Sequence, residues 1–232
     1  LVGDIARTAA TMCALLDEAE IAPSGFATGP APARPSVLAE EARARPPQKP
    51  GFVDMDAALL ALNEAVPADR VLVTDLGRFV TAAWLAFPVR EPRALVNTAH
   101  FGAIGCGLPA AIGAALAAGG RPTLLVAGDG GFALGGLSEL LTAIAHRLDL
   151  IVVICNDDSY GAEHVQFTNR SMDPGLSMLG SPDFAAIARA MGAAGHTVRD
   201  AEELQAACRA VRARSGPLVV DLKLDADRVV MR

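Results

Sequence analysis

No stretch of this sequence is apolar for long enough to cross a membrane. A spanning helix needs about 20 apolar residues, and the alanine-rich stretch at 109–118 is ended by Gly119-Gly120-Arg121. The sequence also lacks a basic cluster, and its net charge is -6. Because binding to a phosphate backbone needs a positive face, we expect neither nucleic acid nor a membrane as a partner.

Cysteine is scarce as well. The four cysteines, at positions 13, 106, 155 and 208, show no paired metal-binding spacing, and two of them fall in apolar runs. We interpret them as small core residues in a reducing compartment. No secretory leader pattern is visible, so we expect a cytoplasmic protein.

The sequence is rich in apolar residues, and strand-like and helix-like patterns alternate along it. At 232 residues and 52% hydrophobic content, the chain has ample apolar residues for a buried core. Short apolar runs typical of buried strands alternate with helical spacing, which predicts an α/β fold: a doubly wound, mainly parallel sheet of about six strands flanked by helices. The expected strands are 71–74, 94–97, 124–127, 151–155 and 218–222, and the clearest helices are 56–65, 183–188 and 201–214.

The composition changes along the chain and predicts three parts. Residues 1–22 contain an amphipathic helix with no preceding elements to pack on, residues 23–50 are proline-rich, and residues 51–232 carry the compact pattern. We interpret the second part as a linker in which a helix at 37–45 is the one regular element. The first part reads as a cut end.

Two turns carry the chemistry. Gly128-Asp129-Gly130 follows one expected strand, and Asn156-Asp157-Asp158-Ser159-Tyr160-Gly161 follows the next, with helical spacing at Leu137, Leu140, Leu141 and Ile144 between them. Both turns therefore lie at the carboxyl edge of one parallel sheet, where open α/β sheets bind ligands.

Asp129 makes the first turn unusual. A glycine turn before a helix offers backbone N–H groups to an anion such as diphosphate, yet a carboxylate there repels that anion unless a cation lies between them. Carboxylate, amide and carbonyl oxygens from the two turns would suit Mg²⁺. Taken singly, Asp129 is read more simply as a helix cap and Asn156-Asp157 as a polar loop, and their spacing together favours the metal.

At this point the sequence resembles a family. Gly128-Asp129-Gly130, twenty-five further residues and Asn156-Asp157 resemble the diphosphate and metal signature of thiamine-diphosphate-dependent enzymes of the acetolactate synthase, benzoylformate decarboxylase and pyruvate decarboxylase group. The stretches 74–79 and 100–113 look like the family's first phosphate-contacting turn and its segment beneath the cofactor. The resemblance covers roughly residues 52 to 225, and it implies thiamine diphosphate and Mg²⁺ as cofactors and a 2-oxo acid as substrate. It also implies that residues 51–232 are the thiamine-diphosphate-binding domain and that residues 1–22 are a remnant of the family's central domain.

The resemblance also implies roles for individual residues. The Gly102 carbonyl would accept from the aminopyrimidine, and Ile104 would wedge the cofactor into its bent form, although a core aliphatic is the plainer reading of Ile104. Arg78 is either a bidentate phosphate ligand or a solvated turn arginine. The implied cofactor-binding residues are Gly77, Arg78, Phe79, Gly102, Ala103, Ile104, Gly128, Asp129, Gly130, Gly131, Asn156, Tyr160, Gly161 and Ala162.

The implied metal ligands depend on the alignment. Aligning on Tyr160-Gly161 gives Asp129, Asp157 and the carbonyl of Ser159, whereas aligning on the asparagine gives Asn156 and Asp158. We prefer the first set. It departs from the family, which more often has asparagine where Asp157 stands, and it places a second full negative charge at the metal.

Substrate chemistry is expected beyond Gly161. Glu163 would be placed to relay a proton to a 2-oxo acid, with His164 as a weaker candidate, and a solvated loop residue is the alternative reading of Glu163. Residues 166–182 are polar and weakly periodic, which predicts a loop or short helix over the cofactor. His146 and His196 are expected at the surface.

Two other functions fit parts of the pattern. Gly128-x-Gly130-x-x-Ala133 with Asp157 formally matches a dinucleotide-binding fingerprint, but the acidic residue lies nearly thirty residues downstream where about twenty is usual. A non-catalytic subunit that kept the fold is the third reading. In the resembled family a glutamate from a pyrimidine-binding domain of a second protomer, in a homodimer or tetramer, activates the cofactor. We therefore expect this chain alone to be inactive, as a fragment or as one half of a split enzyme that is either a decarboxylase or a carboligase.

Overall fold

The computed structural model describes residues 3–19 and 37–230, and the chain divides into two compact units, Leu1–Pro35 and Ser36–Arg232. In the first unit the described residues form helix α1 (Ile5–Glu18). Asp4 caps this helix by accepting a hydrogen bond from the Arg7 backbone at 2.8 Å, and no α1 side chain is buried. The helix expected there is confirmed, while positions 23–36 of the expected linker lie outside the described residues.

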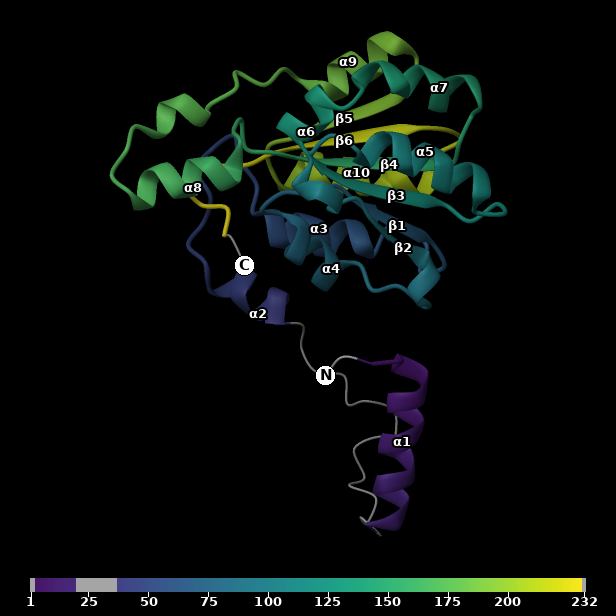
Figure 1. Ribbon diagram of the computed structural model, residues 1–232. Helices are drawn as coiled ribbons and strands as arrows, with labels where there is room; N and C mark the ends of the chain where they lie inside the picture. The colour runs from purple at the N-terminus through teal and green to yellow at the C-terminus, as the bar shows by residue number, and fades with distance from the viewer. Residues whose placement is uncertain (1–2, 20–36, 231–232) are drawn as a thin grey trace. The chain divides into compact units, whose positions relative to one another are not determined.

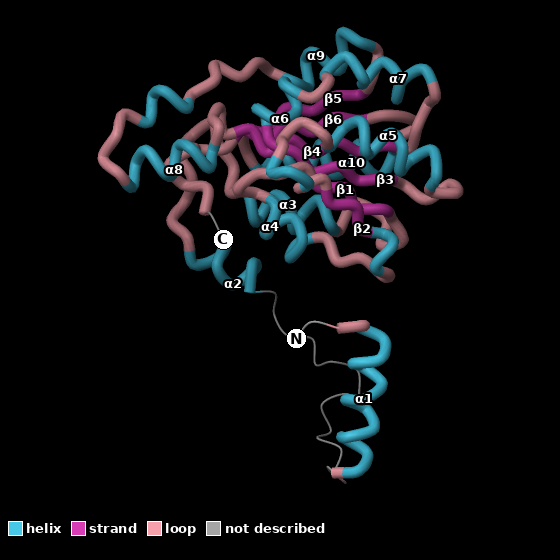
Figure 2. The backbone as a smooth tube through the Cα atoms, viewed as in Figure 1, coloured by secondary structure: helices cyan, strands magenta, loops and turns pink. Residues whose placement is uncertain are grey.

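The second unit is built on one sheet of six strands in the order β2-β1-β3-β4-β6-β5. Every neighbouring pair is parallel, and Figure 2 shows the strands as one magenta layer between helices. The strands are β1 (Val71–Thr74), β2 (Leu95–Asn97), β3 (Thr123–Gly128), β4 (Leu150–Asn156), β5 (Ala194–Val198) and β6 (Leu218–Lys223). The predicted doubly wound parallel sheet is confirmed.

Both faces of the sheet are covered, which explains the apolar character of the central strands. Along β4 successive side chains alternate between two cores, with Ile151 and Val153 in one and Val152 and Ile154 in the other. Figure 1 shows helices on either side of the sheet. The first core takes side chains from α2 (Val37–Ala44), α3 (Met55–Asn63), α4 (Val80–Ala86) and α10 (Ala201–Ala213), and the second from α5 (Gly107–Ala117), α6 (Asp129–Leu134), α7 (Leu140–Ala145) and α9 (Phe184–Met191).

Part of the expected linker packs on this unit. Leu38 of α2 is buried in the first core, and Arg45 pairs with Asp54 at 2.9 Å and with the buried Asp56. Burial of an apolar side chain and a shared ion cluster hold residues 37–56 together. The second compact unit is Ser36–Arg232, and the division into a domain remnant, a linker and a binding domain stays a prediction.

Strand β5 was not among the individually expected strands. The loop or short helix expected at 166–182 agrees with the structure, where the short helix α8 (Gly161–Asn169) and the 3-10 turn η4 (Pro174–Ser177) cover part of this segment. Further 3-10 turns are η1 (Pro92–Ala94), η2 (His100–Gly102) and η3 (Leu137–Glu139).

The isolated cysteines and histidines divide between core and surface. Cys155 and Cys208 are buried as expected, but Cys13 and Cys106 are exposed and are not core residues. His146 is exposed as expected, whereas His196, on the edge strand β5, is half-buried. Burial, followed by the charge of Arg189, lowers the pKa of His196.

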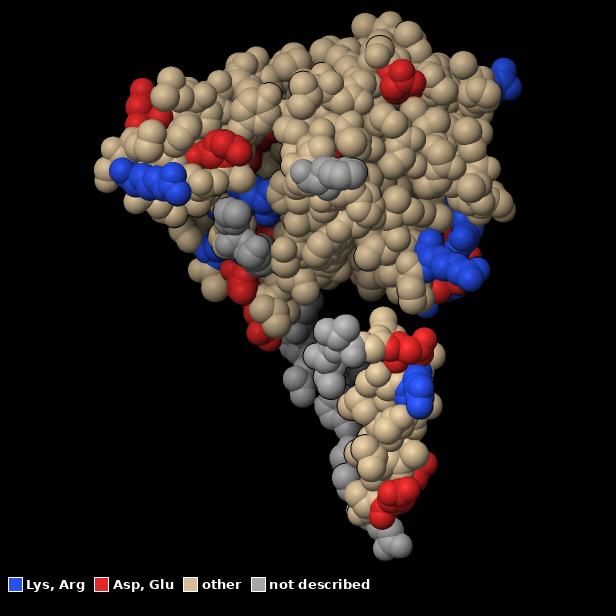
Figure 3. Space-filling model, in the orientation of Figure 1, with Lys and Arg blue, Asp and Glu red and all other residues tan. Residues whose placement is uncertain are grey.

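Charge on the visible surface is dispersed. Figure 3 shows Lys and Arg side chains in small groups, several beside Asp or Glu, with uncharged surface between them. Among the described helices, none combines the length and apolar character that crossing a bilayer requires.

Candidate functional site

The candidate site lies where the direction of strand addition reverses. The chain places β2 on one side of β1 and then returns to place β3 on the other, and such a switch point opens a crevice at the carboxyl ends of the strands. A cavity of about 480 Å³ lies there. Its walls are Leu76, Gly77, Arg78, Phe79, Gly102, Ile104, Gly128, Asp129, Gly130, Gly131, Leu134, Cys155, Asp157, Ser159, Tyr160, Gly161, Ala162 and Glu163. Most of the predicted site residues are thus brought together by the fold.

Asp75 joins the first turn to the loop after β2. Its buried carboxylate accepts hydrogen bonds from the Gly105 backbone at 2.9 Å and from the Thr98 hydroxyl at 3.2 Å. Gly105 has φ +88°, and a side chain there would meet Gly135 Cα at 2.8 Å. The close approach of these two backbones requires glycine, and it lies next in sequence to Ile104 and Leu134, which line the cavity. No pattern in the sequence indicates this role for Asp75.

Asp129 begins α6 directly after β3 and is 2% exposed. Its Oδ2 accepts a hydrogen bond from the Ser181 hydroxyl at 2.6 Å. Burial, and then the charge of Asp157, raises the pKa of Asp129 to about 7, although the bond from Ser181 and backbone N–H groups act in the opposite direction. Ser181 was not expected at the site, because it lies in a segment that the sequence pattern left irregular.

Asp157 and Arg78 form a buried ion pair. Arg78 Nε donates to Asp157 Oδ2 at 2.7 Å, and Nη2 lies 2.5 Å from the same oxygen. The other oxygen, Oδ1, accepts from the backbone and the hydroxyl of Ser159 at 3.1 and 2.7 Å. Arg78 is 6% exposed, so its reading as a solvated turn residue is wrong.

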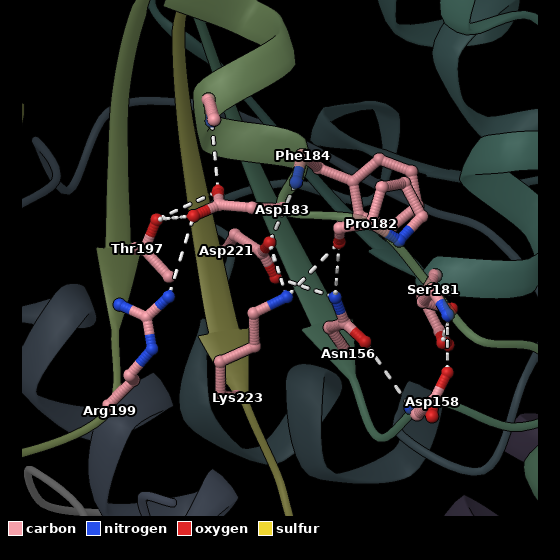
Figure 4. Close-up of polar contacts among 12 residues, drawn as sticks. Asn156, Asp158, Ser181, Pro182, Asp183, Phe184, Thr197, Arg199, Asp221 and Lys223 are labelled. Carbon is pink, nitrogen blue, oxygen red and sulfur yellow. Dashed lines mark hydrogen bonds and ion pairs between the residues drawn. The ribbon is translucent and has the colours of Figure 1, made fainter. Parts of the chain in front are cut away.

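Asn156 points to the neighbouring strand. Its amide nitrogen donates to Asp221 Oδ1 at 3.0 Å and to the Pro182 carbonyl at 3.4 Å, as Figure 4 shows. Its side-chain oxygen accepts from the Asp158 backbone at 3.2 Å. The Asn156 side chain therefore holds the second turn against β6 and the segment before α9. Its direct contact with a cofactor remains a prediction.

The segment before α9 is attached to the same turn. The Leu179 backbone donates to the Asp158 carbonyl at 2.9 Å. The Ser181 backbone donates to the Asp158 carboxylate, as Figure 4 shows. Asp158 has φ +60°, a conformation that aspartate tolerates better than most residues. These bonds position the Ser181 hydroxyl against Asp129.

Glu163 and His164 differ in their surroundings. Glu163 is exposed and lines the cavity in the first turn of α8. His164 is buried, with Nδ1 3.2 Å from the Ser177 hydroxyl and Nε2 3.0 Å from Asp227. Both ring nitrogens of His164 are engaged in holding α8, so its geometry is structural.

The residues present suit a divalent cation that is completed by other oxygens. Among the described residues, no group of three or more His, Cys, Asp and Glu gathers to hold a metal unaided. Asp129 and Asp157 nevertheless face one cavity, and each is nearly buried. Two carboxylates together with a carbonyl oxygen match Mg²⁺, which usually takes its remaining ligands from phosphate or water.

These features define a cofactor-binding domain of one class. The family model for the thiamine pyrophosphate enzyme, C-terminal TPP binding domain, matches residues 75–222. The chain belongs to this family, and thiamine diphosphate is the cofactor of its class.

Individual relatives are enzymes with longer chains. The chain is 35% identical over 198 residues to the probable 2-ketoarginine decarboxylase of Pseudomonas aeruginosa, covering 84% of this chain and 35% of that protein. It is 32% identical over 226 residues to benzoylformate decarboxylase of the same species, covering 96% of this chain and 39% of that protein. The chain thus spans about a third of the length of such curated relatives.

A solved structure shares the fold. The thiamine diphosphate-dependent 4-hydroxybenzoylformate decarboxylase of Rhodococcus jostii RHA1 superposes with a TM-score of 0.68 at 25% identity, covering 78% of this chain and 34% of that one. The six-stranded domain described above is therefore a known architecture within a larger enzyme.

Proposed function

We propose that the domain binds the diphosphate end of thiamine diphosphate through Mg²⁺ held by Asp129, Asp157 and the Ser159 carbonyl. One observation supports this most: two nearly buried carboxylates from neighbouring strand ends face one cavity, and the charge of Asp157, after burial, raises the pKa of Asp129. A divalent cation relieves that repulsion and also attracts diphosphate.

The remaining walls have roles that follow from their chemistry. The backbone N–H groups of residues 77–79 and 128–131 would bind diphosphate oxygens. The Gly102 carbonyl, with φ +67° at that residue, would accept from the aminopyrimidine, and Ile104 would support the bent cofactor. Bound thiamine diphosphate supplies electron-sink chemistry, while the protein contributes position and electrostatics.

For the whole protein we propose a 2-oxo acid decarboxylase or an acetolactate synthase-like carboligase. The activities named for the relatives support this range and do not choose within it. Glu163 is the ionisable side chain at the cavity rim that we assign to proton relay. The partners that we propose are a 2-oxo acid and the pyrimidine-binding domain of a second protomer, and without that domain the chain should bind cofactor weakly and turn nothing over. A non-catalytic subunit that keeps the fold is the competing function, whereas the family match argues against a dinucleotide-binding domain.

Calorimetry tests the cofactor and its metal. Thiamine diphosphate should bind with Mg²⁺ present and should not bind when a chelator removes it, and Asp129→Ala should abolish binding. The matched control is Asp69→Asn, an exposed aspartate whose nearest cation, on Arg121, is 3.8 Å away. Equal affinity with and without Mg²⁺ would sink the metal bridge, and tight binding of NAD would favour the dinucleotide alternative.

A further inference from the structure

Arg78 crosses the carboxyl edge of the sheet. It follows β1, while Asp157 follows β4, and β3 lies between these strands. Beyond its contacts with Asp157, the guanidinium Nη1 donates to the Ala226 carbonyl, after β6, at 2.9 Å. The side chain is 2% exposed. One buried cation therefore ties together the segments that follow three strands.

The chain makes room for this cation. Gly161 opens helix α8 directly against Arg78, and a Cβ at position 161 would collide with Arg78 Nε. Backbone and guanidinium thus meet in van der Waals contact beneath the first turn of α8. This packing fixes the guanidinium at the cavity wall rather than leaving it free to sample solvent.

The charged residues of the cavity wall differ in their burial and in their ion pairing. Its charged residues are Asp129, Asp157, Glu163 and Arg78, and Glu163 is exposed. Among the buried three, Asp157 is neutralised by Arg78, whereas the Asp129 carboxylate accepts a hydrogen bond from the neutral Ser181 hydroxyl. With Asp129 ionised, the buried set carries one net negative charge, and that charge resides on Asp129.

We propose that Arg78 is the built-in counter-ion of the metal site, and that it makes the binding of Mg²⁺ and of diphosphate depend on each other. The inference rests on the proposed function above. With Asp157 neutralised, a lone cation meets one carboxylate, and a lone diphosphate is repelled by Asp129. Bound Mg²⁺ reverses the sign of the site's charge and so attracts diphosphate, and bound diphosphate in turn strengthens the binding of Mg²⁺. Arg78 acts through Asp157 as a positioning residue.

Arg78→Gln and Asp157→Asn should each remove the mutual dependence of the two ligands. The first should favour binding of the metal alone, and the second should favour binding of diphosphate alone. Arg78→Gln leaves two uncompensated carboxylates, so Mn²⁺ alone, followed by its electron paramagnetic resonance signal, should bind about tenfold more tightly than to the wild type. Asp157→Asn leaves a buried guanidinium without its anion, so inorganic diphosphate alone should now bind measurably in the presence of chelator. The double variant, with both charges removed, should regain the requirement for both ligands.

The controls separate a charge effect from damage to the fold. Arg121→Gln with Glu91→Gln removes an exposed pair, 2.9 Å apart, away from the cavity, and should change neither ligand's affinity. Arg78→Lys keeps the charge and should retain most of the mutual dependence. Urea denaturation checks that each variant folds, and the double variant should be more stable than either single one.

The outcomes distinguish this inference from the proposed function. If the wild type binds no Mn²⁺–diphosphate, the proposed function fails and the counter-ion idea falls with it. If the wild type binds it and Arg78→Gln binds Mn²⁺ alone no more tightly than the wild type does, the metal site stands and the counter-ion role of Arg78 is overturned.

Discussion

The side-chain amide of Asn156 donates to the carboxylate of Asp221 at 3.0 Å, inside the sheet between β4 and β6. Asp221 is fully buried and also accepts from the Phe184 backbone at 2.9 Å, with Lys223 Nζ 2.9 Å away. One carboxylate therefore anchors the second turn of the site and the start of α9, and these contacts are drawn in Figure 4.

Replacing Asp221 should destabilise the domain strongly. Asp221→Ala leaves the Asn156 amide and the Phe184 N–H unpaired in the interior, and we expect a loss of roughly 3–5 kcal/mol in the free energy of unfolding. Urea denaturation measures it. Asp149→Asn, which breaks an exposed pair with Arg214, should cost less than about 1 kcal/mol. Equal losses for the two variants would contradict the anchoring role.

Asp129 should make the ligand-free domain less stable as pH rises. Because its pKa in the folded chain is about 7 and its ordinary value is 3.8, the folded state retains a proton in this window that the unfolded state has released. Its contribution to stability is therefore greatest below the window and is lost as pH rises through it. Denaturation of the wild type and of Asp129→Asn below, within and above this window measures the difference between them. A difference that does not vary with pH would refute the raised pKa.

The close approach of Gly105 and Gly135 should tolerate no side chain. A Cβ on Gly135 would collide with the Gly105 carbonyl, so Gly135→Ala should cost roughly 1–3 kcal/mol and distort the cavity wall. Gly113, inside α5, has open space around its missing Cβ, and Gly113→Ala should stabilise by roughly 0.5–1 kcal/mol. Thermal unfolding of the two variants should therefore shift in opposite directions.

Substitutions of Glu163 and of His164 should have different effects in a reconstituted enzyme that carries the pyrimidine-binding domain. Glu163→Gln should leave thiamine diphosphate affinity intact and slow 2-oxo acid turnover by roughly a hundredfold, because a proton relay is lost. His164→Gln should lower stability, because it weakens the attachment of α8 to Ser177 and Asp227, while cofactor affinity changes little. Unchanged turnover of every 2-oxo acid tried would contradict the proton-relay role of Glu163.

The sequence predicted the elements whose burial leaves a strong pattern. β1, β3, β4 and β6 are nearly continuous apolar runs because both of their faces are covered. β5 was missed because it is an edge strand, Ala194–Val198, with glycine, histidine and threonine at its centre. A left-handed Gly192 that ends α9 is the one local signal that a new element begins there.

At the site, turn glycines and acidic residues were predictable, and their partners were not. The contact between Arg78 and Asp157 joins residues 79 positions apart, and that between Ser181 and Asp129 joins residues 52 apart. These partners meet because of the order of the strands in the sheet, and the sequence around either residue does not reveal that order. The same reason applies to His164, whose ring is engaged by a residue 63 positions away.

The parallel arrangement of the strands also determines at which stage of folding the site forms. Its walls come from segments between residues 76 and 163 that meet only once each crossover has brought the next strand into place. Contacts of such long sequence separation form late in folding. A ligand of this edge should therefore recognise only the completed sheet. Its binding should slow amide hydrogen exchange across all central strands together, by raising the free energy of global opening.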